Sequence, residues 1–97
     1  MKPNRTPLAS ILTLALAAAI RIANFKFEPA TLEIAAGDTV TWSNSDDEIH
    51  AVVSDDGGFR SGVIEGDTQF AHTFDKPGTY AYRCALHPQM SGTIVVR

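Results

Sequence analysis

Short stretches of alternating apolar and polar residues, separated by turn residues, make up this chain from residue 20 onward. Val40 and Trp42, for example, stand between threonines. Because successive side chains of a strand point to opposite faces, a period of two predicts β-strands rather than helices. The expected strand segments are 20–27, 31–34, 39–42, 50–53, 69–74, 79–84 and 93–96, with a loop over 57–67 that holds at most one short strand. The fold class is therefore all-β, and seven to eight strands must form two facing sheets or a small barrel to keep their apolar faces dry.

The first nineteen residues have the pattern of a secretory signal peptide. A basic start precedes an apolar run over residues 8–19, which ends in two A-x-A cleavage signals at 15–17 and 17–19. The run is shorter than the roughly 20 residues that span a bilayer. We therefore expect residues 1–19 to direct export and to be removed, and residues 20–97 to form one periplasmic domain. The domain would be peripheral to the membrane if the signal were retained, and it would not be stably inserted after its removal.

The charges exclude one class of partner. The chain has 8 Lys and Arg against 11 Asp and Glu, and the basic residues are scattered along it. Nothing forms the positive stripe that phosphate binding requires, so we expect no nucleic-acid partner. The acidic run Asp46-Asp47-Glu48 is read as a solvated loop.

The single cysteine constrains the chemistry of an exported chain. Cys84 has no second cysteine to pair with, although an oxidising compartment normally favours disulfides. A lone thiol there is buried and inert, joined to another chain, or bound as a thiolate to a metal.

Three possible metal donors follow each other at a spacing of three residues. They are Cys84, which ends a predicted strand, His87 and Met90. In a tight turn, side chains at i and i+3 project the same way, so all three can converge. His50 follows a polar loop and offers a second imidazole. Two imidazoles, one thiolate and a weak thioether are the donor set of blue copper sites. Four protein donors leave no open position, which favours electron transfer over catalysis.

The third histidine is expected to have another role. His72 shares a predicted strand face with Phe70 and Phe74, where a hydrogen-bonded, partly buried histidine is the simpler interpretation.

Several longer pieces of the chain resemble a known family. The pieces are 27–29, 37–42, Asn44 six residues before His50, 78–84 and 87–92. Together they resemble the cupredoxins, the type 1 blue copper proteins, and the loop over 84–90 is similar to that of the amicyanin-like members. The resemblance implies a Greek-key β-sandwich with one copper ion at one end.

The resemblance also implies roles for individual residues. It implies that His50, Cys84, His87 and Met90 ligate the copper, and that Asn44 ties the two ligand loops together. The implied function is a small carrier of single electrons between protein partners, not an enzyme.

Other functions use parts of the same pattern. Copper storage or delivery would need the same ligands. An immunoglobulin-like module would explain Trp42 and the Tyr82-x-Cys84 pattern, but the earlier cysteine of its disulfide is missing. A copper enzyme would need more histidines than His72 supplies.

The residues beside His87 suggest how a partner would approach. If this ring reaches the surface, Leu86 and Pro88 flank it with a small apolar patch. Small transient contacts suit an electron carrier that must release its partner quickly. We expect transient redox partners at this patch and a monomeric protein.

Overall fold

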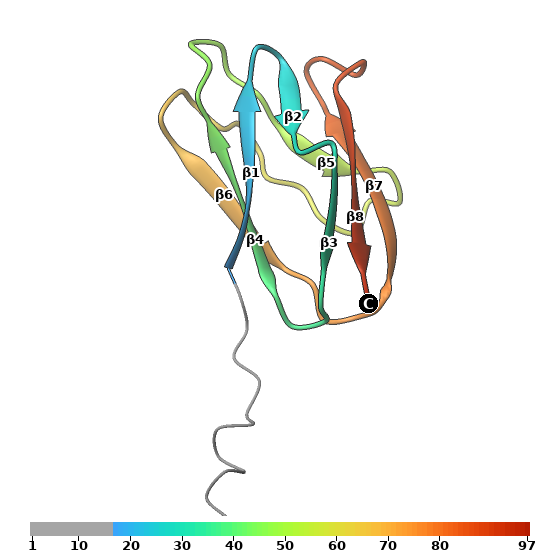
Figure 1. The fold of residues 1–97 in the computed structure, drawn as a ribbon. Coiled ribbons are helices and arrows are strands. Elements are labelled where there is room, and N and C mark those ends of the chain that lie inside the picture. The colour runs from blue at the N-terminus through green and yellow to red at the C-terminus, as the bar shows by residue number, and fades with distance from the viewer. Residues whose placement is uncertain (1–16) are drawn as a thin grey trace, which may run out of the picture.

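Eight strands and no helix make up residues 17–97, the part of the chain that the computed structural model describes (Figure 1). The strands are β1 (Ala17–Ala23), β2 (Lys26–Glu28), β3 (Thr31–Ile34), β4 (Thr39–Asn44), β5 (Val52–Ser54), β6 (Gln69–Thr73), β7 (Gly78–Cys84) and β8 (Ser91–Val96). The all-β prediction is confirmed, and the strand count agrees with the expected range.

The strands form two four-stranded sheets, as the alternating pattern predicted. One sheet has the order β2-β1-β4-β6 and the other has the order β3-β8-β7-β5. β1 pairs in parallel with β4, and β3 pairs in parallel with β8, while the other neighbours are antiparallel. Both sheets are therefore mixed, because the chain crosses from one sheet to the other instead of running only through hairpins.

Alternate residues of both sheets meet in one apolar core. Trp42 from β4 and Tyr82 from β7 are its largest members, and their rings lie in a T-shaped contact with centroids 5.4 Å apart. The other core residues that are at most 1% exposed are Ile20, Ile22, Val40, Val52, Cys84 and Ile94. Tyr82 also explains Gly92 on the paired strand, since its hydroxyl occupies the space that a Cβ at residue 92 would need.

The first predicted strand, 20–27, is wrong in one respect: it is two strands joined by a tight hairpin. Ala23 pairs with Lys26, so only Asn24 and Phe25 form the turn, and both have positive φ angles, of 55° and 59°. Such turns normally carry glycine at the second position. Because phenylalanine stands there, the sequence showed no sign of the break.

β1 also starts earlier than expected. Ala17, Ala18 and Ala19, which were predicted to belong to the signal peptide, pair with the first three residues of β4. Residues 1–16, which include the rest of that segment, lie outside the described part of the chain. The boundary of the domain at residue 20 stays a prediction.

The predicted loop over 57–67 contains no strand. It is attached to the sandwich by two isolated bridges, between Val53 and Arg60 and between His50 and Ile64. Figure 1 shows that the β1–β2 turn, the loop after β4 and the loop between β7 and β8 lie at the same end, opposite the C-terminus. These loops carry the candidate site.

His72 lies in the core-facing row of β6, away from that end. Its ring stacks on Phe59, with centroids 4.7 Å apart and planes 20° apart, and meets Phe74 edge to face. Burial lowers the pKa of His72, and the nearby Asp75 carboxylate offsets part of this effect. The partly buried position agrees with the expectation, but within residues 17–97 the ring makes aromatic contacts rather than the expected hydrogen bond.

The lowered pKa predicts how stability depends on pH. The folded protein favours neutral His72, so this stability is present above the unfolded pKa of about 6.5 and is lost as the pH falls from there through the lower pKa of the folded state. We expect the free energy of unfolding of metal-free His72→Phe to fall less than that of the wild type between about pH 7.5 and pH 5.5. Urea unfolding at each pH measures this, and parallel curves for the two proteins would contradict it.

Candidate metal centre

Three of the four predicted ligands converge at one end of the sandwich. The Sγ atom of Cys84 lies 3.7 Å from Nδ1 of His50 and 3.7 Å from Nδ1 of His87. All three donor atoms lie within 4.8 Å of one another. Cys84 ends β7, His50 lies between β4 and β5, and His87 lies between β7 and β8, so the cluster joins segments from both sheets.

The distances between the donors fit a metal ion bound by a thiolate and two imidazoles. Metal–sulfur bonds of about 2.3 Å and metal–nitrogen bonds of about 2.0 Å, at angles of about 110° to 120°, separate sulfur from nitrogen by about 3.5 to 3.8 Å. The separations of 3.7 Å fall in this range. A soft thiolate with two imidazoles suits copper in both common oxidation states.

Backbone pairing fixes the position of Cys84. Val52 of β5 stands opposite Cys84, and the N–H of Ala85 donates to the carbonyl of Ala51 over 2.9 Å. This register points the N–H of Ala51 at Cys84 Sγ, 3.3 Å away. An N–H aimed at a thiolate stabilises its negative charge, so the pairing that places the sulfur also adjusts its electrostatics.

The loop from Cys84 to Met90 closes on itself through its backbone. The N–H of Met90 donates to the carbonyl of His87 over 2.9 Å, and the N–H of Cys84 donates to the carbonyl of Met90 over 3.0 Å. The predicted tight turn with a spacing of three residues is present between His87 and Met90.

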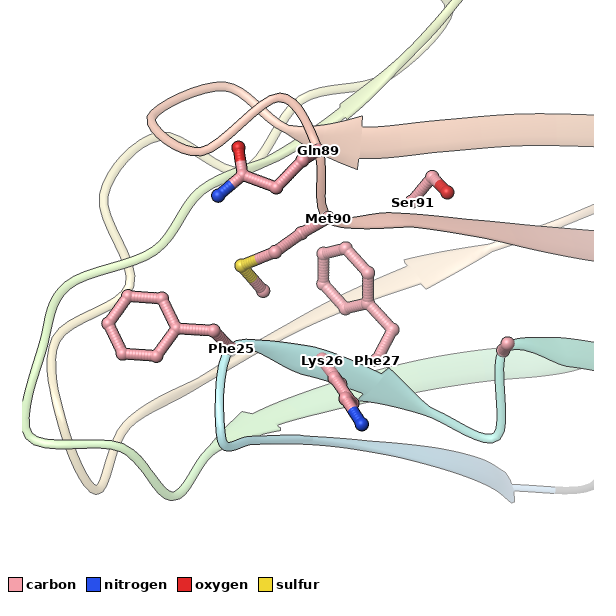
Figure 2. A pocket seen from close by; sticks show the side chains of 7 residues that line it. Phe25, Lys26, Phe27, Gln89, Met90 and Ser91 are labelled. Atoms are coloured by element: carbon pink, nitrogen blue, oxygen red, sulfur yellow. The ribbon is translucent and has the colours of Figure 1, made fainter.

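Met90 is buried at 3% exposure beside a surface groove of about 190 Å³. Figure 2 shows its sulfur directed toward the ring of Phe25, with Phe27 on its other side. Its role as a ligand stays a prediction.

His50 is fully buried and is held from two sides. Its backbone exchanges hydrogen bonds with Ile64, over 3.1 Å and 2.7 Å. Its ring Nε2 lies 2.9 Å from the carboxylate of Asp46. Because an ionised carboxylate only accepts, Nε2 carries a proton, which leaves Nδ1, on the side of Cys84, as the nitrogen of a neutral imidazole that can bind a metal. The contact therefore selects the tautomer that binds a metal.

Asp46 is a functional residue that the sequence analysis missed. Its side chain is only 13% exposed, and it accepts hydrogen bonds from the N–H groups of Asn24 and Phe25, over 2.7 Å and 3.0 Å. Burial raises the pKa of Asp46, but the bonds from Phe25, His50 and Asn24 outweigh it and hold this pKa below its usual value. The prediction of a solvated acidic loop is wrong at this residue, although Asp47 and Glu48 are exposed. The only sequence signal was the spacing of four residues from His50.

Asn44 also acts differently from the expectation. Its amide donates to the carbonyls of Glu48 and Ile64, over 2.9 Å and 3.0 Å, and its Oδ1 accepts from the N–H of Asp46. These bonds fold the loop that carries His50 and attach it to Ile64. The resemblance implied that Asn44 ties this loop to the one carrying Cys84, but the hydrogen bonds of its side chain go to Asp46, Glu48 and Ile64.

Exposed apolar side chains lie near the donor cluster. Four large hydrophobic side chains are exposed within residues 17–97, and three of them adjoin the centre in sequence or in space: Phe25, Ile49 and Leu86. His87 itself is partly exposed, whereas His50 and Cys84 are not. The ring of His87 is therefore the part of the cluster that solvent reaches.

Comparisons with known proteins agree with this geometry. The family model of the cupredoxin-like domain matches residues 13–96. Amicyanin from Paracoccus denitrificans is 32% identical over 99 residues, which cover 97% of this chain and 76% of the relative. Plastocyanin from Scenedesmus fuscus is 35% identical over 85 residues, covering 73% of this chain and 86% of the relative. The structure of a Cu(I) form of an amicyanin variant superimposes with a TM-score of 0.79 at 32% identity, covering 91% of this chain and 89% of that one. These matches decide against the immunoglobulin-like alternative.

The Asp46 contact predicts a loss of metal affinity. Asp46→Asn keeps the shape of the side chain but removes the charge that selects the tautomer of His50. We expect its affinity for Cu(II) to fall by about 10- to 100-fold, the usual effect of losing a partner that orients a ligand. Competition with a chelator of known affinity measures this loss.

Asp47→Asn is the matched control, because it removes the same charge from an exposed neighbour. Equal affinities for the two variants would show that the contact does not support the site.

Proposed function

The chain belongs to the cupredoxin family, and from this membership and the donor cluster we propose that it carries single electrons between redox partners. Copper is the cofactor that both the family and the donor chemistry indicate. We propose His50, Cys84, His87 and Met90 as its ligands. The observation that carries the proposal is the pair of 3.7 Å separations between the sulfur of Cys84 and the two imidazole nitrogens.

The surroundings of the donors favour electron transfer over turnover of a substrate. The chemistry that bound copper would supply is the gain and loss of one electron. The N–H of Ala51 holds the sulfur of Cys84, and the carboxylate of Asp46 holds the ring of His50, so neither side chain need move when the charge of the centre changes. Both side chains are 0% exposed, which leaves little room for a substrate beside the donor atoms.

The partly exposed ring of His87 is the proposed point of electron entry and exit. Leu86 and Phe25, at 46% and 42% exposure, and Ile49, at 44%, would form an apolar rim around it, together with Pro88. An apolar rim excludes water from a contact without strong charge pairing, which suits a partner that binds briefly. We expect Leu86→Asp to exchange electrons with redox proteins more slowly than the wild type does. An unchanged rate would contradict His87 as the point of electron entry and exit.

The copper centre predicts a specific optical signature. Cu(II) added to metal-free protein should produce an intense visible band from charge transfer between the thiolate and copper. Cys84→Ser should abolish that band, because the hydroxyl is a hard donor that stays protonated. Visible absorption spectra of the two proteins at equal copper loading measure the difference.

Electrochemistry separates a carrier from a store. A reversible one-electron wave with fast exchange is expected for the copper-loaded wild type. An intense band without reversible exchange would instead support copper storage or delivery, which needs the same ligands.

We also propose that the segment before β1 directs export to the periplasm. Residues 17–97 contain no helix of the length and apolarity that crossing a membrane requires. Cleavage after Ala19 would remove three of the six residues of β1 that pair with β4, whereas cleavage after Ala17 would remove one. Keeping more of this parallel pairing supports the earlier of the two A-x-A signals.

The N-terminus of the exported protein tests this proposal. Intact-mass measurement of protein recovered from the periplasm of a bacterial host should show a chain that begins at Ala18. A chain that begins at Ile20 would favour the later signal, and an unprocessed chain found with the membranes would indicate that the segment is retained.

A further inference from the structure

The turn between β1 and β2 contains a residue in an unfavourable conformation beside the metal centre. Phe25 has a φ of 59°, in the left-handed region that bulky side chains rarely adopt. Asn24, at 55°, suits the first position of such a turn, but the second normally carries glycine. Glycine would build the hairpin with less strain, so the hairpin alone does not explain a phenylalanine at this position.

The ring of Phe25 contacts both imidazoles of the cluster. Its centroid lies 5.0 Å from that of His50 and 5.0 Å from that of His87, with the planes at 84° and 85°. The two imidazoles are themselves 5.1 Å apart at 62°. The three rings thus form a triangle in which each ring limits the rotation of the other two, and T-shaped contacts of this kind are favourable.

The strained turn is connected to the centre through one carboxylate. Oδ2 of Asp46 accepts both the N–H of Phe25, over 3.0 Å, and Nε2 of His50, over 2.9 Å. Oδ1 of the same residue accepts the N–H of Asn24 over 2.7 Å. Strained residues persist where the surrounding structure determines their conformation, and they gather at functional sites. Here the bonds to Asp46 hold the backbone of the turn, so the ring above it is held against the ligands.

We propose that Phe25 is a positioning residue of the metal centre: its ring holds His50 and His87 in the ligand orientation and covers the centre from water. This inference rests on the proposed copper site but not on electron transfer. Phe25 is 42% exposed, so its ring forms the outer surface of the site rather than part of the core. A cover of this kind slows the loss of a bound metal, because an imidazole must turn away from the metal before solvent can replace it.

Two substitutions separate the ring from the strain of the turn. Phe25→Leu keeps an apolar side chain in the same conformation but removes the ring, whereas Phe25→Gly removes both the ring and the strain. Val63→Ala is the control for loss of an exposed apolar side chain, since Val63 is 60% exposed and carries no aromatic ring. Thermal unfolding of the metal-free proteins checks that all variants fold.

The first measurement is the rate at which a strong Cu(I) chelator removes copper from the reduced protein. We expect both Phe25 variants to lose copper about tenfold faster or more, in line with other residues that orient metal ligands, and Val63→Ala to match the wild type. The same comparison with Zn(II) uses no redox chemistry, so it tests the role of Phe25 even if the protein does not carry electrons. Wild-type release rates in both Phe25 variants would overturn the proposal.

The second measurement needs no metal. In NMR spectra of the metal-free wild type, we expect contacts between the Phe25 ring protons and both imidazoles. Carbon relaxation of the two histidine rings should show greater ring mobility in Phe25→Leu than in the wild type or in Val63→Ala. Absence of these contacts, or unchanged mobility, would contradict the proposal even if the chain bound no copper.

Discussion

The thiol of Cys84 and the two imidazoles beside it attract one another only weakly in the absence of a metal, so the rest of the protein must bring them together. The pairing of β5 with β7 fixes the position of the Cys84 sulfur, and the backbone hydrogen bonds with Ile64 fix the position of His50. The positions of the donors are therefore set by the fold of the chain. A centre built in this way changes little in shape when its charge changes, which is the physical property that transfer of one electron requires.

Asp46 connects the parts of this arrangement. Through one carboxylate it selects the tautomer of His50 and holds the turn that carries Phe25. The several donors keep the carboxylate ionised although it is partly buried. The two sheets supply a frame that many proteins could share, whereas these contacts at one end give the fold its chemistry.

Structural features that depend on a few neighbouring residues were predicted well from the sequence. The period of two located most strands, and the spacing of Cys84, His87 and Met90 indicated a turn, because both follow from backbone geometry over a few residues. The break at Asn24 and Phe25 was not predicted, since its usual glycine is absent. The contact that holds that turn in place comes from Asp46, more than 20 residues away, and no pattern within the turn records it.

The sequence by itself determined the all-β class, the chemical types of the candidate donors and the presence of two loops that carry them. It indicated His50 as the partner of the cysteine mainly because a second imidazole was needed. Only the tertiary structure decided which neighbours orient the donors: Asp46 behind His50, the N–H of Ala51 on Cys84, and Phe25 across both rings. The physical reason is that side-chain type and strand periodicity are properties of the local chain, whereas hydrogen bonds and ring contacts between distant segments depend on how the two sheets pack.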